Sequence, residues 1–200
     1  LKATEAAAIA AAKLRGNSDG KAADKVATEA MRTVLQDSEI HTRVVIGEGE
    51  RDDAPMLYIG EEMGNSDSRL KIDIAVDPLE CTNHCANDLP DALSVLAAAP
   101  RGKLLHAPDT YMNKLCGSSK LLGHVSLLNS IEENVSLAAK ALDKNISELK
   151  IIIMDRERHI ELIAKMKELN VEPILIGDGD VSGGLKAVEG NVDLLYGIGA

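Results

Sequence analysis

Aromatic residues are almost absent from this sequence: its 200 residues include three Tyr but no Phe and no Trp. The core therefore has to be packed from aliphatic side chains, because the large rings that dominate many protein interiors are missing. The hydrophobic fraction of 45% and the charged fraction of 27% are still those of a globular domain. A chain of this length can bury one large core or two small ones.

Long apolar runs and an excess of basic residues are missing as well. No stretch approaches the roughly 20 apolar residues that a membrane-spanning helix needs. A net charge of −10 and a pI near 5.0 argue against nucleic acid or an anionic membrane as a partner, since both require a basic surface. An acidic chain can still bind phosphate groups, but it needs a metal ion or a local basic cluster to do so.

Cysteines are few, and their number is odd: Cys81, Cys85 and Cys116 form no CxxC pair. This pattern predicts reduced thiols in an intracellular compartment. We expect that compartment to be the cytoplasm, or a plastid if the source is a photosynthetic eukaryote. Cys81, Cys85 and His84 offer zinc ligands, but a structural zinc site normally uses four, so zinc is not favoured.

The first half of the chain mixes helical and strand-like patterns. Apolar spacing and turn residues predict helices over 2–15, 21–36 and 56–59, strands over 43–46, 72–76, 92–98 and 103–106, and a loop over 83–91. The later third alternates regularly. Its pattern predicts helices over 131–142, 157–169 and 181–188 and strands over 150–154, 173–176 and 192–196.

This βαβαβ alternation indicates a parallel sheet, whose ligands bind at the carboxyl ends of its strands. Asp155, Arg156 and Arg158 follow one of these strands, and Asp178-Gly179-Asp180 follows the next. We therefore expect an α/β protein with an N-terminal metal-binding lobe over residues 1–145 and the start of a substrate-binding lobe over 146–200.

One acidic stretch follows the predicted strand 72–76: Asp77-Pro78-Leu79-Glu80-Cys81-Thr82. The proline is expected to break the strand, because it has no N–H to donate and its φ is fixed. Two carboxylates, a peptide carbonyl and a hydroxyl in this spacing can converge on Mg²⁺ or Mn²⁺, which favour oxygen ligands. Considered alone, the six residues fit an ordinary acidic turn equally well.

A second acidic stretch follows the predicted strand 43–46. Its sequence, Gly47-Glu48-Gly49-Glu50-Arg51-Asp52-Asp53, places four carboxylates within six residues. Such groups repel one another, and the glycines allow the backbone to bend closely around a cation. A solvated acidic loop is the alternative. Asp24, in the first turn of the helix predicted over 21–36, is by itself most simply a residue that compensates the helix dipole.

In combination, these segments closely resemble the class II fructose-1,6-bisphosphatases, especially the cyanobacterial type that also accepts sedoheptulose-1,7-bisphosphate. The resemblance follows the order of the family over nearly the whole chain. The matching segments are Lys21-Ala22-Ala23-Asp24, residues 45–60, residues 73–80, Ala107-Pro108-Asp109, Tyr111-Met112, Asp178-Gly179-Asp180 and residues 196–200.

The resemblance implies membership of the lithium-sensitive, metal-dependent phosphatase superfamily, with its layered α/β/α/β/α fold and Mg²⁺ or Mn²⁺ as cofactor. It further implies hydrolysis of the 1-phosphate of a sugar bisphosphate, in gluconeogenesis or the Calvin cycle, by a homo-oligomer, in relatives usually a tetramer.

The same resemblance assigns roles to individual residues. The metal ligands would be Asp24, Glu48, Asp77, Glu80 and the carbonyl of Leu79. Thr82 together with Asp52 would orient and deprotonate the attacking water. The substrate would contact Glu80, Cys81, Thr82, Tyr111, Arg156, Arg158, Asp178, Gly179, Asp180 and Ala200.

Some positions depart from the family pattern. Cys81 replaces a glycine of the family's DPxEGT signature, Gly20 replaces a lysine, and Glu157 separates the two arginines. The family also continues beyond the position of Ala200 to a further glutamate ligand, so we expect that a C-terminal part is missing. These departures leave two alternatives open. One is a catalytically weakened paralogue with a binding or regulatory role, and the other is a phosphatase acting on an inositol phosphate or a nucleotide-derived phosphate.

Overall fold

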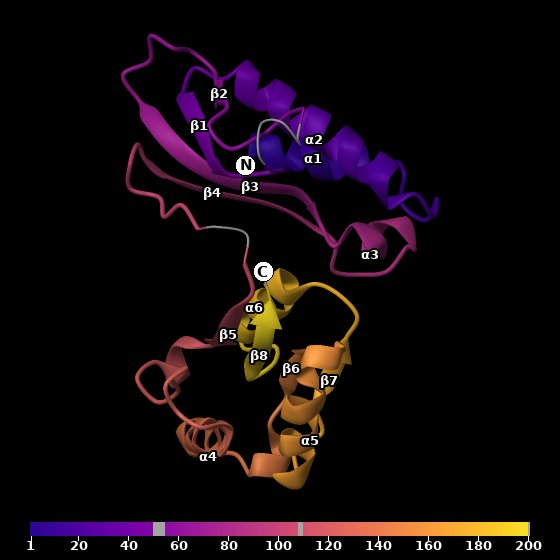
Figure 1. Cartoon of the computed structure of the whole chain (residues 1–200), viewed down its shortest axis with the longest axis vertical. Coiled ribbons are helices and arrows are strands. Elements are labelled where there is room, and N and C mark those ends of the chain that lie inside the picture. Colours follow the sequence, from indigo (N-terminus) through magenta and orange to yellow (C-terminus); the bar gives the residue numbers. More distant parts are fainter. Residues whose placement is uncertain (50–54, 108–109, 200) are drawn as a thin grey trace. The chain divides into compact units, whose positions relative to one another are not determined.

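The computed structural model describes residues 1–49, 55–107 and 110–199. The chain forms two compact units, Leu1–Pro108 and Asp109–Ala200, each built around its own four-stranded sheet (Figure 1). The division falls earlier than the boundary predicted after residue 145. The reason is that strand β5 (Met112–Gly117) and helix α4 (Ile131–Leu142) belong to the second sheet and its core.

The first unit packs two helices on one face of a mixed sheet (Figure 1). Its elements are α1 (Lys2–Ala12), α2 (Gly20–Gln36), β1 (His41–Ile46), β2 (Glu62–Met63), β3 (Lys71–Glu80), α3 (Thr82–Ala86) and β4 (Leu93–Pro100). The strand order is β2-β1-β3-β4, with β1 and β3 parallel and the other neighbours antiparallel. Small residues spaced four apart, such as Ala3, Ala7 and Ala11 of α1, are buried and allow close packing of the helices.

Strand β3 is longer than predicted, because it continues through Pro78 to Glu80. The ladder to β4 pairs Asp77 with Val95 and Glu80 with Leu93, and its register shifts between these pairs. This irregularity accommodates the missing N–H of the proline without ending the strand. The prediction that Pro78 breaks the strand is therefore wrong, and the acidic stretch lies on the last residues of β3.

Three other local predictions in the first unit are also wrong. The segment 56–59 contains no helix, and helix α3 (Thr82–Ala86) occupies the first part of the predicted loop 83–91. Residues 103–106 form no strand, because hydrogen bonds to the outer face of the sheet hold this segment. Gly102 N donates to Asp73 Oδ2 over 2.6 Å, and the His106 ring bonds to the Val45 carbonyl over 2.7 Å.

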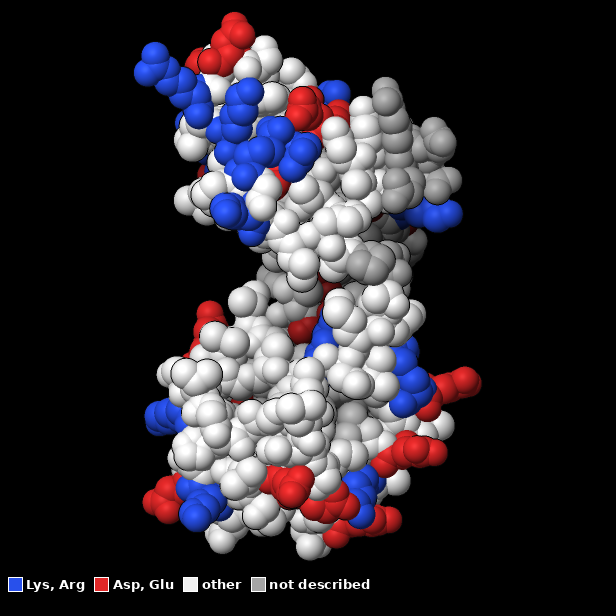
Figure 2. Space-filling model, turned by 60° about the vertical axis from the view of Figure 1, so that its left-hand side comes forward, with Lys and Arg blue, Asp and Glu red and all other residues white. Residues whose placement is uncertain are grey.

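That outer face carries an ion-pair network centred on Asp73, whose side chain is only 1% exposed. Both of its oxygens accept hydrogen bonds from Arg43 over 3.0 Å, and Arg101 Nε lies 3.2 Å away. Figure 2 shows Lys and Arg side chains gathered on one face of the first unit, although the whole chain is acidic. The buried carboxylate is thus satisfied by two guanidinium groups, as a buried charge must be.

The second unit places helices on both faces of its sheet. Its elements after β5 are η1 (Ser119–Leu121), α4, η2 (Ile146–Glu148), β6 (Ile151–Met154), η3 (Glu157–His159), α5 (Ile160–Glu168), β7 (Ile174–Ile176), α6 (Asp180–Glu189) and β8 (Leu194–Gly199). The strand order is β5-β8-β6-β7. Strand β6 is parallel to β7 and β8, as predicted, whereas β5 is antiparallel to β8 and was not predicted.

Two aliphatic cores stabilise this sheet. The larger contains Val135 and Ala138 of α4 and Met166 of α5, and the smaller contains Ala187 of α6. Helix α6 approaches closely because of Gly183, where a Cβ would lie 2.7 Å from Leu195. The α/β fold class is confirmed. No helix within the described ranges combines the length and apolar character needed to cross a membrane.

Candidate functional site

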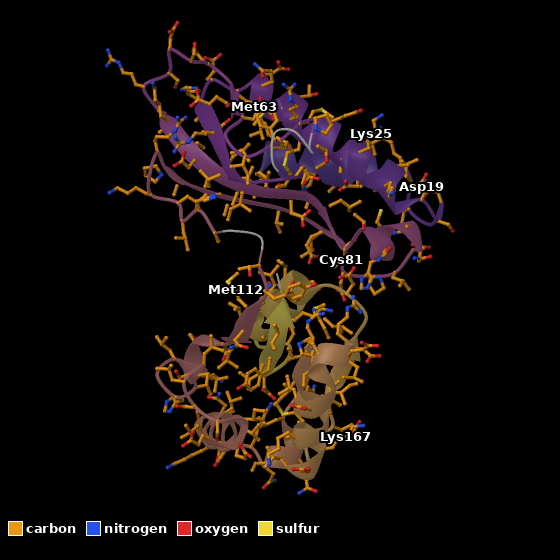
Figure 3. The ribbon with its side chains drawn as sticks, viewed as in Figure 1. Asp19, Lys25, Met63, Cys81, Met112 and Lys167 are labelled. Atoms are coloured by element: carbon orange, nitrogen blue, oxygen red, sulfur yellow. The ribbon has the colours of Figure 1, made fainter. Side chains whose placement is uncertain are left out.

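An open pocket of about 470 Å³ lies between the start of α2 and the start of α3 in the first unit. It is lined by Ser18, Asp19, Gly20, Lys21, Asp24, Thr82 and Asn83. Hydrogen bonds from Gly16 N and Ser18 N to α3 carbonyls, both 2.9 Å, fix the two helix ends together. Figure 3 labels Asp19 and Cys81, which immediately precede these two helices. The fold therefore brings together two residues predicted for the site, Asp24 and Thr82.

The pocket has room for the start of a side chain at position 20, where the resemblance predicts a lysine. A Cβ on Gly20 would lie 3.4 Å from the Thr82 carbonyl oxygen, which is an ordinary van der Waals contact. Lys21, one residue later, lines the same pocket and supplies a positive charge. The pocket therefore keeps one positive charge, that of Lys21, although position 20 has no lysine.

Three predicted carboxylates influence one another electrostatically: Asp24 on α2, Glu48 after β1 and Asp77 on β3. Burial raises the pKa of Glu48 to about 7, and the negative charges of Asp24 and Asp77 add to the effect. Burial also raises the pKa of Asp24. Perturbed carboxylates of this kind are typical of catalytic and metal-binding sites, where a cation would relieve the repulsion.

The donor types at this site suit Mg²⁺ or Mn²⁺, because carboxylate oxygens dominate and each gains from a nearby cation. Over the described residues, however, no three Asp, Glu, His or Cys side chains already converge closely enough to hold a metal ion. Asp77 Oδ1 instead accepts a hydrogen bond from Leu79 N over 3.1 Å. The oxygen ligands and the negative charge of these residues thus suit a hard cation. Two other residues predicted for the site, Asp52 and Ala200, lie outside the described residues.

Cys81 sits between the end of β3 and the start of α3 in a left-handed backbone conformation, with φ 65° and ψ 54°. Its thiol donates to Glu80 Oε2 over 2.6 Å, and the residue is only 7% exposed. Glycine adopts this backbone conformation without a steric cost, whereas a residue with a Cβ pays one. Cys81 therefore holds this turn at a cost in energy, which a glycine at the same position would avoid.

Several of the residues predicted for substrate binding lie at one edge of the second sheet, formed by the carboxyl ends of its parallel strands, whereas Glu80, Cys81 and Thr82 lie in the first unit. Arg156 and Arg158 follow β6, and Asp178 and Asp180 follow β7, so both pairs occupy carboxyl ends of parallel strands. Tyr111 precedes β5, whose first residue pairs with Gly199 at the end of β8. The antiparallel β5 thus brings Tyr111 to the edge where the other four lie.

Contacts within this cluster hold the side chains of its two arginines, Arg156 and Arg158, in place. The Arg158 guanidinium lies 4.8 Å from the centre of the Tyr111 ring, and its Nε donates to the Ile198 carbonyl over 2.9 Å. Arg156 Nη1 donates to the Asp155 carbonyl over 3.1 Å. Gly179, with φ 94°, allows the turn that starts α6. Tyr111 remains 64% exposed, so it is accessible to a ligand.

Two residues of this edge were missed by the sequence analysis. Lys114 on β5 forms an ion pair with Asp180, and a Cβ on Gly199 would lie 2.5 Å from the same carboxylate. His159 is buried and bridges two backbones, accepting from Ile198 N over 2.8 Å and bonding to the Met154 carbonyl over 2.7 Å. Recognising the strand 112–117 would have identified Lys114, whereas no local pattern marks His159.

The whole chain is similar to known proteins of one family. A model of the family described as bacterial fructose-1,6-bisphosphatase, glpX-encoded, matches residues 1–200. Proteins named D-fructose 1,6-bisphosphatase class 2/sedoheptulose 1,7-bisphosphatase, from Synechococcus sp. (strain JA-3-3Ab) and from Nostoc sp. (strain PCC 7120), are 44% and 43% identical over the whole chain. A relative from Acaryochloris marina is 45% identical. The chain spans 61 to 62% of the length of these relatives.

Proposed function

The chain belongs to the family of glpX-encoded bacterial fructose-1,6-bisphosphatases, and on that premise we propose that the protein hydrolyses the 1-phosphate of fructose 1,6-bisphosphate. Sedoheptulose 1,7-bisphosphate is the second substrate we propose, because the relatives' names include it. The observation that carries the proposal is the carboxylate group of Asp24, Glu48 and Asp77, in which burial, reinforced by the charges of Asp24 and Asp77, raises the pKa of Glu48 to about 7.

Metal binding is part of this proposal. Asp24, Glu48, Asp77, Glu80 and the Leu79 carbonyl would hold Mg²⁺ or Mn²⁺, both of which prefer oxygen ligands. When bound, such a cation supplies charge screening for the phosphoryl group and acidifies a coordinated water. Thr82, at the first position of α3, would orient the attacking water together with Asp52. Their joint role is to hold and accept the proton of that water.

Substrate binding would involve the edge of the second sheet. Arg156 and Arg158 carry the positive charge that a phosphate group requires, and Asp178 and Asp180 offer carboxylates to sugar hydroxyls. Contacts of this type act in the ground state and in the transition state alike, so their loss should raise KM more than it lowers kcat. We further propose that the protein acts as a homotetramer in the cytoplasm or a plastid, within gluconeogenesis or the Calvin cycle.

A weakened paralogue that binds sugar phosphates without turnover is the second candidate, and Cys81 specifically favours it. The thiol occupies a position where the related enzymes have no side chain, and it bonds to Glu80, one of the proposed metal ligands. A ligand engaged in this way is less available to a cation. The paralogue would retain the substrate contacts of the second unit while losing rate at the metal.

The test is phosphate release by the purified full-length protein from both bisphosphates, with Mn²⁺ and with Mg²⁺. Metal-dependent release from the 1-position supports the phosphatase. Binding of fructose 1,6-bisphosphate without release, together with turnover in a Cys81→Gly variant, supports the weakened paralogue. Neither binding nor release with either substrate would refute both.

A further inference from the structure

The segment that carries Glu48 is held against residues 57–59, which follow it in the chain. Glu48 N donates to the Leu57 carbonyl over 3.0 Å, and Ile59 N donates to the Gly49 carbonyl over 3.0 Å. The approach is so close that a Cβ on Gly47 would lie 2.0 Å from the Leu57 carbonyl oxygen. The position of the Glu48 backbone therefore depends on the position of Leu57.

Leu57 is itself held in an unfavourable conformation. Its φ is 53°, in the left-handed region, although it is a bulky residue without a local hydrogen-bonding side chain. Its side chain is fully buried. A conformation of this kind persists only where surrounding contacts fix it, and it is most often found at functional sites.

The contacts that fix Leu57 lead to a buried ion pair. Glu61 is 5% exposed, and its Oε2 accepts a hydrogen bond from Leu57 N. Its other oxygen accepts a hydrogen bond from Arg32 Nε over 2.8 Å. Arg32 lies on α2, the helix that also carries Asp24. The two oxygens of one carboxylate thus connect the Glu48 segment to the Asp24 helix.

We propose that Glu61 and Arg32 are positioning residues that set the distance between Glu48 and Asp24. Neither residue lines the 470 Å³ pocket, so they act through the backbone of Leu57 and through α2. The functional consequence rests on the proposed function, in which Glu48 and Asp24 bind one divalent cation. Both carboxylate oxygens of Glu61 are required, one for Arg32 Nε and one for Leu57 N. A glutamine at position 61 would offer only one acceptor oxygen for these two donors.

The chain offers a matched control in its second unit. Asp193 is 8% exposed, pairs with Lys144 Nζ over 2.7 Å and accepts from Lys150 N over 2.8 Å. This arrangement reproduces that of Glu61: a buried carboxylate, one cation and one backbone N–H. Asp193→Asn therefore removes an equivalent interaction from a unit that carries none of the proposed metal ligands. Its effect on stability should match that of Glu61→Gln.

The experiment compares Glu61→Gln, Arg32→Lys and Asp193→Asn in the full-length protein. Mn²⁺ affinity is measured by titration calorimetry and by the electron paramagnetic resonance signal of free Mn²⁺. We expect Glu61→Gln to weaken Mn²⁺ binding about tenfold or more, Arg32→Lys to weaken it less, and Asp193→Asn to leave it unchanged. Equal weakening in Glu61→Gln and Asp193→Asn, or unchanged binding in Glu61→Gln, would overturn the proposal.

Hydrogen exchange of the Glu48 amide tests the positioning without any metal, and so separates this proposal from the proposed function. We expect Glu61→Gln and Arg32→Lys to accelerate exchange at Glu48 well beyond the acceleration that Asp193→Asn causes there. If the wild type binds no Mn²⁺ but the exchange changes as expected, the positioning role stands and the metal-dependent function fails. Unchanged exchange at Glu48 in a folded Arg32→Lys protein would overturn the positioning role, even if Glu61→Gln does not fold.

Discussion

Replacing Cys81 with glycine should lower stability by only about 1–2 kcal/mol while it strengthens metal binding. Relief of the left-handed strain stabilises the fold by about 1–2 kcal/mol. Loss of a small, 7% exposed side chain costs about 1 kcal/mol, and the greater freedom of glycine in the unfolded chain costs about 0.4–1 kcal/mol more. These terms nearly cancel, so the lost hydrogen bond from the thiol to Glu80 should decide the result and lower the free energy of unfolding by about 1–2 kcal/mol in urea titrations.

Metal affinity should respond differently, because the thiol no longer bonds to Glu80. A hydrogen bond to a charged acceptor contributes about 1.5–3 kcal/mol, and a thiol is a weak donor at the lower end of this range. Freeing Glu80 should therefore tighten Mn²⁺ binding by about tenfold, since 1.4 kcal/mol corresponds to a factor of ten. Calorimetric titration of the full-length protein with Mn²⁺ measures this change directly.

Two further substitutions separate the thiol from the backbone. Cys81→Ala removes the hydrogen bond but keeps the strain, so it should gain metal affinity and stay less stable than the glycine variant. Cys81→Ser keeps both a donor and the strain, so it should resemble the wild type in affinity. The reasoning is refuted if the glycine and alanine variants bind Mn²⁺ no better than the wild type.

Three other outcomes are expected. Gly47→Ala should destabilise the first unit by about 3 kcal/mol or more in chemical denaturation, because its Cβ would lie 2.0 Å from the Leu57 carbonyl oxygen; a loss below 1 kcal/mol would contradict this. Arg158→Ala should raise KM for fructose 1,6-bisphosphate about tenfold with a smaller change in kcat in steady-state assays, and an unchanged KM would exclude Arg158 from the substrate site. Because the pKa of Glu48 is raised from 4.5 to about 7, its stabilising contribution is complete below pH 4.5 and is lost as pH rises to about 7. Without metal, stability should fall by about 1–2 kcal/mol over this range, after allowance for solvent screening, and Glu48→Gln should remove the fall in pH-dependent thermal melts.

Much of the architecture follows from local patterns in the sequence. The helix 131–142 was predicted with the bounds that the structure has, because apolar residues recur at helical spacing, and the structure adds a capping box of Ser130 and Glu133 at its start. The parallel strands β6, β7 and β8 were predicted for the same reason, since apolar runs alternate with helices. Errors arose where long-range contacts decide the structure. The segment 103–106 has the pattern of a strand, but bonds to Asp73 and Val45 fix it outside the sheet.

The site could be predicted in its residue types more easily than in its geometry. Carboxylates at the ends of two predicted strands indicated Glu48 and Asp77 as candidates, and the resemblance to the family, not the local pattern alone, favoured a metal site over a solvated acidic turn. The ion pair of Lys114 with Asp180 could not be predicted, because it depends on the pairing of β5 with β8, and these two strands are far apart in the chain. Glu61 and Arg32 carry no local signal, because a buried ion pair between a loop and a helix has no characteristic spacing.

The strained backbone positions add an independent argument for where the function lies. In the described part of the chain, the non-glycine residues with positive φ are Ser18, Leu57, Cys81, Asp88, Asp91, Asp143 and Asn170. All but two are Ser, Asp or Asn, which adopt this conformation at low cost through local hydrogen bonds. Leu57 and Cys81 have no such compensation, and each adjoins one of the two acidic segments. Departures from local sequence preferences are expected at functional sites. Here both strained residues contact a proposed metal ligand: the Leu57 carbonyl accepts from Glu48 N, and the Cys81 thiol donates to Glu80.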